Sequence, residues 1–231
     1  MPNKVKLSSR ILSDVFWRLV LIQDEESGPQ RDALLARTLT LEPLRQQAEY
    51  KTGSINFAQS WLLYATVRYF GFKRIMEVGT FIGRSASAMG SGMDDAGVEG
   101  EIFTCDFSNS MALPWSGVST LRQFPKTSST DMLKQLDGEF DFVFLDGRLT
   151  AEDLPLLDAL ISPDTIFGLD DFEGMEKGVA NLFALSRLAK LKRHFLLHPP
   201  SQALLAERGF TSYSLMALLV PVSVFEFARQ G

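Results

Sequence analysis

The feature that most constrains the fold is an alternation of short apolar segments with helical segments, which begins near residue 73. The apolar segments cover residues 74–78, 101–105, 119–124, 140–145, 165–169, 194–197 and 215–220. Most of them are separated by segments of helical periodicity, at 83–93, 128–136, 151–160 and 174–190. Strands that alternate with helices form βαβ units, whose strands are parallel and whose helices cover both faces of the sheet. The sequence therefore predicts an α/β fold with a mostly parallel sheet of seven strands.

The last two apolar segments depart from this alternation. Only a short helical piece near residues 201–207 separates them. A connection that tight joins neighbouring antiparallel strands more readily than parallel ones. We therefore expect the last strand of the sheet to be antiparallel.

The first 70 residues are expected to be helical. Ile11, Val15, Leu19 and Ile22 recur at helical spacing, and residues 27–29 then break the pattern. Two further helices are expected over residues 30–48 and 56–70. We predict an N-terminal helical extension over residues 1–52 and a main domain over 53–231. The extension is expected to cover a substrate pocket as a lid, to form a homodimer interface, or to complete the core.

Composition excludes several classes of protein. With 231 residues, 45% apolar and 22% charged, the chain can bury a core and is too apolar for disorder. Its net charge of −5 disfavours a nucleic-acid partner, which would need a basic face. No apolar run reaches the roughly 20 residues of a bilayer span, so no membrane association is expected. The cluster Lys190, Lys192 and Arg193 is interpreted as a solvated helix end.

Cysteine usage and the N-terminal residues bear on the compartment. Cys105 is the single cysteine, so no internal disulfide can form and a reducing compartment is the simplest interpretation. Lys4, Lys6 and Arg10 lie near the N-terminus, but no apolar segment and cleavage site of a secretory signal accompany them. We expect a cytoplasmic protein.

A glycine-containing turn follows the first strand, in Glu77-Val78-Gly79-Thr80-Phe81-Ile82-Gly83-Arg84-Ser85. Gly79 and Gly83 permit a tight turn and the close approach of a ligand to the backbone. The helix that follows offers free amide groups to a carboxylate or a phosphate. A phosphate-binding loop would require Gly-Lys-Ser/Thr, and Phe81 stands where a dinucleotide fingerprint has its second glycine. The turn therefore does not favour a pyrophosphate ligand.

Asp106 ends the second strand, where an open α/β sheet places a carboxylate that accepts hydrogen bonds from ribose hydroxyls. The combination of Glu77, the glycine turn and Asp106 resembles the first motif and acidic residue of class I S-adenosylmethionine-dependent methyltransferases. The form Glu-x-Gly-Thr-x-x-Gly-x-Ser is closest to the catechol O-methyltransferase type, and the resemblance extends over about residues 53–220. It implies a Rossmann-like methyltransferase fold, an S-adenosylmethionine cofactor and methyltransferase activity in the main domain.

The resemblance also implies a set of donor-binding residues. Gly79 and Gly83 would back the methionine portion, Ser85 would bond its carboxylate, and Asp106 would hold the ribose. Phe107 would pack on the adenine and Ser128 would lie beside it, although Ser128 is equally a candidate helix N-cap. The complete predicted set is Glu77, Gly79, Thr80, Phe81, Gly83, Ser85, Asp106, Phe107, Ser128 and Asp146.

Three carboxylates follow two later strands. Asp146 ends the fourth strand, and Asp170 and Asp171 end the fifth. If these strands are neighbours, the carboxylates converge and repel one another unless a cation or a proton intervenes. Mg²⁺ or another hard divalent cation would satisfy them. The alternative is that Asp146 binds the amino group of the donor while Asp170 or Asp171 caps a helix that begins near Gly174.

The same layout resembles metal-dependent small-molecule O-methyltransferases, in which the metal binds the substrate hydroxyl, lowers its pKa and orients it. The resemblance implies a metal site of Asp146, Asp170 and Asp171. The chain departs from the family at Leu149, where relatives have a lysine or a histidine. Asp146, Arg148 and His198 are the remaining catalytic candidates, with Arg148 as a clamp for an acidic substrate or a surface residue.

We therefore expect methyl transfer from S-adenosylmethionine to a hydroxyl of a small molecule, with assistance from a divalent metal. Metal-independent transfer to nitrogen is one alternative, and a non-catalytic partner that retains the fold is another. A nucleotide-dependent oxidoreductase is disfavoured by the missing dinucleotide glycine. Trp17, Trp61 and Trp115 are interpreted as core or interface residues, and the acceptor molecule cannot be inferred from the sequence.

Overall fold

The computed structural model describes residues 9–21, 28–48, 53–108, 115–173 and 175–226. Seven strands form one sheet in the order β3-β2-β1-β4-β5-β7-β6. Strand β7 pairs antiparallel with both β5 and β6, and the remaining neighbours pair in parallel. The predicted fold class is confirmed, including the antiparallel last strand. Among the described residues, no helix combines the length and the apolar content that a membrane crossing requires.

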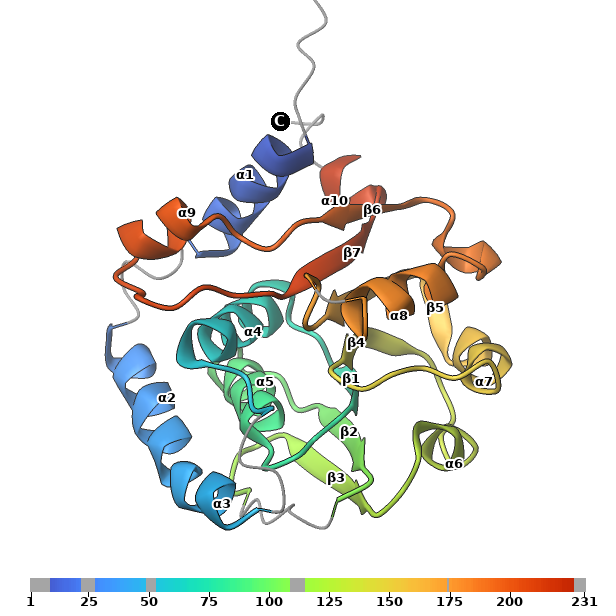
Figure 1. Ribbon diagram of the computed structural model, residues 1–231, viewed down its shortest axis with the longest axis horizontal. Helices are drawn as coiled ribbons and strands as arrows, with labels where there is room; N and C mark the ends of the chain where they lie inside the picture. The colour runs from blue at the N-terminus through green and yellow to red at the C-terminus, as the bar shows by residue number, and fades with distance from the viewer. Residues whose placement is uncertain (1–8, 22–27, 49–52, 109–114, 174, 227–231) are drawn as a thin grey trace, which may run out of the picture.

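The elements follow the predicted alternation (Figure 1). The strands are β1 (Arg74–Val78), β2 (Glu101–Asp106), β3 (Thr120–Pro125), β4 (Phe140–Leu145), β5 (Ile161–Leu169), β6 (His194–Leu197) and β7 (Ala217–Pro221). The helices are α1 (Ser9–Leu21), α2 (Gly28–Thr40), α3 (Glu42–Gln47), α4 (Phe57–Phe70), α5 (Arg84–Asp95), α6 (Ser129–Leu133), α7 (Asp153–Ala159), α8 (Gly178–Leu185), the 3₁₀ turn η2 (Ala189–Leu191), α9 (Gln202–Glu207) and α10 (Ser223–Glu226).

Two apolar cores lie on opposite faces of the sheet, because successive side chains of a strand point to opposite faces. On β4, Phe142 and Phe144 belong to the core that packs against α1, α4 and α5. Val143 and Leu145 belong to the core that packs against α6, α7 and α8. Figure 1 shows α4 and α5 on one side of the sheet and α6, α7 and α8 on the other. A continuous apolar strand is thus explained by burial on both faces.

The helices before residue 53 are attached to the rest of the chain by side-chain contacts. The Trp17 indole is fully buried and donates a hydrogen bond to the carbonyl oxygen of His198 at 2.9 Å. Arg84, at the start of α5, forms an ion pair with Glu42 of α3 at 2.8 Å. Arg31 of α2 donates to the carbonyl oxygen of Arg208 at 2.9 Å. The division at residues 52 and 53 stays a prediction, as do the lid and dimer roles.

Several predicted boundaries differ from the structure. The helix expected over 30–48 is two helices, because Pro43 stands in the first turn of α3 and begins a new helix there. The break expected at 27–29 is displaced, since Gly28 and Pro29 already lie in α2, while Ile22 and Ser27 fall outside the described residues. Strand β5 begins at Ile161, four residues earlier than predicted, because Pro163 and Asp164 weaken the strand signal.

The helix expected over 174–190 begins later. Helix α8 starts at Gly178 and ends at Leu185, and Lys177 at its N-cap makes no side-chain cap bond. The alternative in which Asp170 or Asp171 caps this helix is therefore wrong, and Gly174 falls outside the described residues.

Candidate functional site

The candidate site is built on one row of residues at the carboxyl edge of the sheet. Val78 of β1 is in register with Cys105 of β2 and with Leu145 of β4, and Leu145 is in register with Leu169 of β5. The next residue of each strand therefore stands in the same row. Those residues are Gly79, Asp106, Asp146 and Asp170, and the sequence predicts a functional role for each of the four. This is also the edge at which open α/β sheets bind their ligands.

Gly79 opens the turn after β1 in a conformation that other residues rarely adopt. Its φ is +102°, and a Cβ atom there would lie 2.9 Å from the backbone nitrogen of Gly147. Gly147 is equally crowded, because its Cβ would lie 2.8 Å from a side-chain atom of Val78. The two glycines thus allow the loops after β1 and β4 to touch, and this contact fixes Asp146 beside the turn after β1.

Asp106 organises the same turn through its carboxylate. One oxygen accepts the Phe81 backbone N–H at 2.7 Å, and the other accepts the Ser108 backbone N–H at 2.7 Å. Phe81 has a φ of +47°, a left-handed conformation that such strong local contacts can hold. A carboxylate has about four acceptor positions, so both oxygens retain capacity for a ligand hydroxyl.

A buried chain of hydrogen bonds lies behind the turn. The Thr80 hydroxyl is bonded to the Thr104 hydroxyl, which donates to the carboxylate of Glu77. Both Glu77 and Thr104 are fully buried. Burial raises the pKa of Glu77 to about 7, although the Ser85 and Thr104 hydroxyls act to lower it. The buried side chains of Glu77 and Thr80 therefore support the turn from within the protein.

The three carboxylates predicted from the sequence do converge. One oxygen from each of Asp146, Asp170 and Asp171 lies within 4.8 Å of the others. Burial, followed by the charge of Asp170, raises the pKa of Asp146 well above its usual value. Burial, followed by the charge of Asp171, also raises the pKa of Asp170. Gln59 of α4 donates a hydrogen bond from its side-chain amide to Asp170.

Lys177 enters the cluster and was not predicted from the sequence. Its Nζ lies 2.9 Å from an oxygen of Asp146 and 2.9 Å from an oxygen of Asp171. Burial lowers the pKa of Lys177, but the two carboxylates outweigh this and raise it overall. The signal for Lys177 was weak, because a lone lysine in the segment Glu173–Lys177 is typical of a solvated loop. Gln59 carried a better signal, as a large polar residue in the mostly apolar first half of α4.

Two cavities meet at this edge of the sheet. The first has a volume of about 180 Å³ and is lined by Gly53, Gly79, Phe81, Asp106, Ser108, Asp146 and Lys177. The second has a volume of about 260 Å³ and is lined by Gly53, Ser54, Ile55, Asn56, Gln59, Asp170, Asp171, Tyr213 and Leu215. Gly53 lines both, and the acidic cluster contributes carboxylates to both. The arrangement suits two molecules bound side by side.

The other predicted donor-binding residues lie in different settings. Gly83 is the N-cap of α5 with a φ of +81°, and Ser85 in the first turn of that helix is buried. Phe107 is 81% exposed, which leaves its ring free to pack on a ligand. The Ser128 hydroxyl accepts the Asp131 backbone N–H at 3.0 Å, so Ser128 does serve as the N-cap of α6.

The predicted catalytic residues other than Asp146, which are Arg148 and His198, do not line the two cavities of the acidic cluster. Arg148 is 63% exposed and lies 3.9 Å from Glu176, an arrangement typical of a surface ion pair. His198 lines a different cavity of about 550 Å³, which also includes Phe172 and shares Tyr213 with the second cavity. Leu149 has a hydrocarbon side chain and so offers no base, and its backbone N–H donates to the side chain of Asn181.

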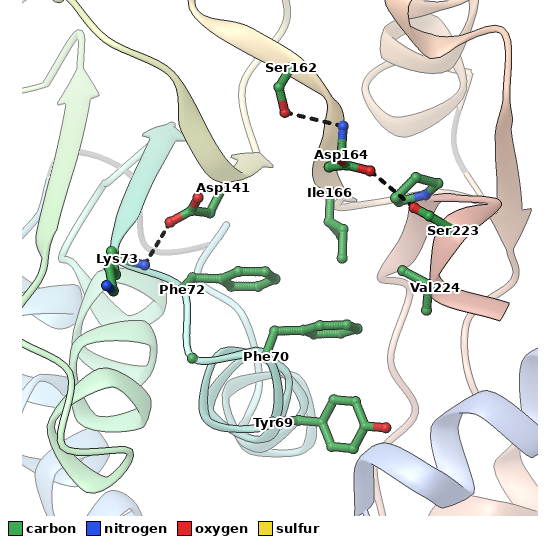
Figure 2. A pocket seen from close by; sticks show the side chains of 12 residues that line it. Tyr69, Phe70, Phe72, Lys73, Asp141, Ser162, Asp164, Ile166, Ser223 and Val224 are labelled. Atoms are coloured by element: carbon green, nitrogen blue, oxygen red, sulfur yellow. Dashed lines mark hydrogen bonds between the residues drawn. The ribbon is translucent and has the colours of Figure 1, made fainter. Parts of the chain in front are cut away.

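A larger cavity of about 560 Å³ lies at the amino edge of the sheet (Figure 2). Phe70 and Phe72 project side by side into it, opposite Val224. Polar groups that line this cavity are hydrogen-bonded to one another. Asp141 accepts the Lys73 backbone N–H at 2.7 Å, and Asp164 accepts the Ser223 hydroxyl at 3.0 Å. Because ligands of open α/β sheets bind at the carboxyl edge, this cavity is not the candidate site.

Comparisons with known proteins agree with this geometry. Residues 76–172 match the sequence model of a family described as "Methyltransferase domain". No curated protein sequence matches the chain. Among solved structures, the S-adenosylhomocysteine-bound methyltransferase PaMTH1 of Podospora anserina is 20% identical, with a TM-score of 0.57 over 82% of this chain and 88% of its own.

Two further structures have the same fold. The O-methyltransferase TomG of Streptomyces achromogenes, bound to S-adenosylmethionine, is 17% identical with a TM-score of 0.57 over 96% of this chain and 99% of its own. A methyltransferase of Geobacter sulfurreducens is 10% identical with a TM-score of 0.53 over 82% of this chain and 88% of its own. At these identities the likeness establishes the fold, and the matched segment contains Glu77, Asp106, Asp146, Asp170 and Asp171.

Proposed function

We propose that this chain, whose residues 76–172 form a methyltransferase domain of class I fold, transfers the methyl group of S-adenosylmethionine to a hydroxyl of a small molecule. The observation that carries the proposal is the row formed by Gly79, Asp106 and Asp146 along one cavity, with a second cavity beside it. The donor is assigned to the first cavity and the acceptor to the second. TomG, an O-methyltransferase with S-adenosylmethionine bound, supports this choice of donor and acceptor atom.

On the donor side, each residue has a distinct task. The Asp106 carboxylate accepts the ribose hydroxyls, and its bonds to the Phe81 and Ser108 amides fix its orientation beforehand. Gly79 lets the methionine portion approach the backbone. The amide groups at the start of α5, near Ser85, face the methionine carboxylate. Asp146 attracts the positively charged part of the donor.

S-adenosylmethionine supplies a methyl group that is activated by its bond to a positively charged sulfur. When the acceptor oxygen bonds to the methyl carbon, the carbon–sulfur bond breaks, its electron pair stays on sulfur, and the acceptor must lose a proton. Asp170 is suited to take that proton, because it lines the second cavity and its pKa is raised by burial and then by Asp171. Gln59 orients the Asp170 carboxylate by its hydrogen bond.

A divalent metal, predicted from the three carboxylates, is a separate hypothesis for the same reaction. The chemistry of the oxygen ligands suits Mg²⁺, and their spacing within 4.8 Å is compatible with a shared ion. The surroundings of these oxygens do not suit a divalent ion, because the Lys177 ammonium group already contacts both Asp146 and Asp171. We therefore assign no step of the reaction to a metal.

The first experiment measures donor binding by calorimetry with S-adenosylmethionine and S-adenosylhomocysteine. Asp106→Ala should weaken binding about 10- to 100-fold, the loss expected for hydrogen bonds to a charged group. Asp164→Asn, at the opposite edge of the sheet, is the matched control and should bind as the wild type does. If neither compound binds the wild-type chain at millimolar concentration, the proposed function is refuted.

The second experiment identifies the acceptor. The chain is incubated with methyl-labelled donor and a panel of phenols, sugars and amines, with and without Mg²⁺ and with chelator. Product from phenols or sugars supports the proposal, whereas product from amines alone favours the alternative of transfer to nitrogen. Donor binding without any product favours the non-catalytic alternative. The homodimer and the cytoplasmic location remain predictions that sedimentation and cell fractionation would test.

A further inference from the structure

We infer that the Lys177 ammonium group is the positive charge that holds the acidic cluster together, and that the chain uses it in place of a divalent cation. The inference rests on the proposed function for its catalytic meaning, but its physical content concerns the cluster alone. Lys177 is a positioning residue in this account. Its role here is to fix the carboxylates of Asp146 and Asp171 in position.

The contacts of Lys177 match the task of a bridging cation. Its Nζ lies 2.9 Å from Asp146, whose side chain is 9% exposed, and 2.9 Å from Asp171, whose side chain is 46% exposed. These residues follow different strands, β4 and β5. The ammonium group thus joins the loops of two neighbouring strands, as a metal ion bound to the same oxygens would.

The position of Lys177 is built into the backbone around it. Asn181 of α8 is buried, and its backbone N–H donates to the carbonyl oxygen of Lys177 at 2.8 Å. The Asn181 side chain donates to the carbonyl oxygen of Gly147 at 2.8 Å and accepts the Leu149 N–H at 3.0 Å. Asn181 therefore ties the turn that carries Lys177 to the loop that carries Asp146.

Gly178 supplies an independent constraint on the same turn. A Cβ atom at Gly178 would lie 2.5 Å from the carbonyl oxygen of Asp170 and 2.7 Å from the Cα of Phe172. Only glycine permits an approach this close without a backbone shift. Gly178 is thus packed against the loop after β5, which carries Asp170 and Asp171. This packing holds Lys177 close enough for its side chain to reach the carboxylates of Asp146 and Asp171.

Charge repulsion then opposes a metal at these oxygens. A divalent ion bound to Asp146 and Asp171 would lie about 2.0–2.6 Å from their oxygens. Those oxygens are each 2.9 Å from Nζ, so the ion and the ammonium group would be close neighbours of like charge. The wild-type chain should bind divalent cations weakly here, and removal of the ammonium group should create a metal site.

The test uses Mn²⁺ as the probe, with binding followed by electron paramagnetic resonance on the full chain. Lys177→Ala should bind Mn²⁺ at least about tenfold more tightly than the wild type, because one repulsive charge is lost and three carboxylates are left. Lys177→Met, which keeps the length of the side chain, should show the same gain. Lys134→Ala removes an exposed lysine at the C-cap of α6 and is the matched control, for which no gain in Mn²⁺ affinity is expected.

A second substitution locates the new Mn²⁺ site. Adding Asp171→Asn to Lys177→Ala should abolish the gain in affinity, since Asp171 is one of the two ligands released by the lysine. The inference is overturned if wild-type protein binds Mn²⁺ as tightly as the Lys177 variants and loses that binding with Asp171→Asn. Calorimetry with S-adenosylhomocysteine on the same samples tests the proposed function separately, because donor binding and Mn²⁺ binding are independent measurements.

Discussion

Glu77 offers the sharpest physical test of the fold around the turn after β1. Its carboxyl group is fully buried, and burial raises its pKa from 4.5 to about 7. Between these two pH values the folded chain retains a proton that the unfolded chain releases. Stability therefore falls as the pH rises from about 4.5 to about 7, and the contribution of Glu77 is constant above that range. The difference in pKa corresponds to roughly 3 kcal/mol of unfolding free energy.

Glu77→Gln removes this titration while it retains an acceptor for the Thr104 hydroxyl. The variant should gain stability relative to the wild type as the pH rises, by up to roughly 3 kcal/mol between pH 4.5 and pH 8. Near pH 4.5 both chains carry a neutral side chain at this position, so their stabilities should be similar. Asp146 and Asp170 also have raised pKa values, but they titrate equally in both chains and cancel in the difference.

The assay is urea unfolding at several pH values and constant ionic strength, with the slope against urea compared between the two chains. Glu152→Gln is the control, since Glu152 is an exposed residue at the start of α7 without a side-chain cap bond. The free energy of unfolding of the wild type is compared with that of Glu77→Gln at each pH. If the difference between them is the same at pH 5 and pH 8, the claim that burial keeps Glu77 protonated is refuted.

Two further predictions concern the same edge of the sheet. Gly79→Ala should destabilise the chain by about 2 kcal/mol and weaken donor binding, because the φ of +102° and the contact with Gly147 both exclude a Cβ atom. Gly97→Ala is its control in thermal unfolding and calorimetry, since Gly97 has a φ of +67° and nothing within 4 Å of its Cβ position. Cys105 should resist iodoacetamide at pH 8 in the native state, because burial raises the pKa of its thiol to about 12, and labelling at the rate of the unfolded chain would contradict this.

Much of the fold follows from the sequence, because burial on both faces leaves a direct trace in the residue pattern. The strands β1, β4 and β6 have the predicted bounds, and β1 and β4 are buried over most of their length. Strand β3 lies at the end of the sheet order, with several exposed positions, so its signal was weaker. The boundaries near Pro43 and Pro163 were missed, because a single proline shifts the start of an element without changing the wider pattern.

The candidate site was predictable only in part. Gly79, Asp146 and Asp170 are each the first residue after a strand and Asp106 is the last residue of β2, and parallel strands bring such residues into one row. Lys177 and Gln59 come to the site from helices or their flanking turns, where sequence position does not fix proximity. The repulsion among three carboxylates did imply a compensating positive charge, and the structure supplies an ammonium group where the sequence suggested a metal.

The contact between the loops after β1 and β4 links the two halves of the site. Gly79 leaves no room for a Cβ atom against Gly147, and Gly147 leaves none against Val78, so neither loop can shift without the other. Asp146 stands in the second of these loops, where it lines the first cavity and contacts Lys177. Lys177 in turn contacts Asp171, which lines the second cavity. One connected set of contacts thus runs from the turn after β1 to the loop after β5, through two close-packed glycines and the partly exposed ammonium group of Lys177.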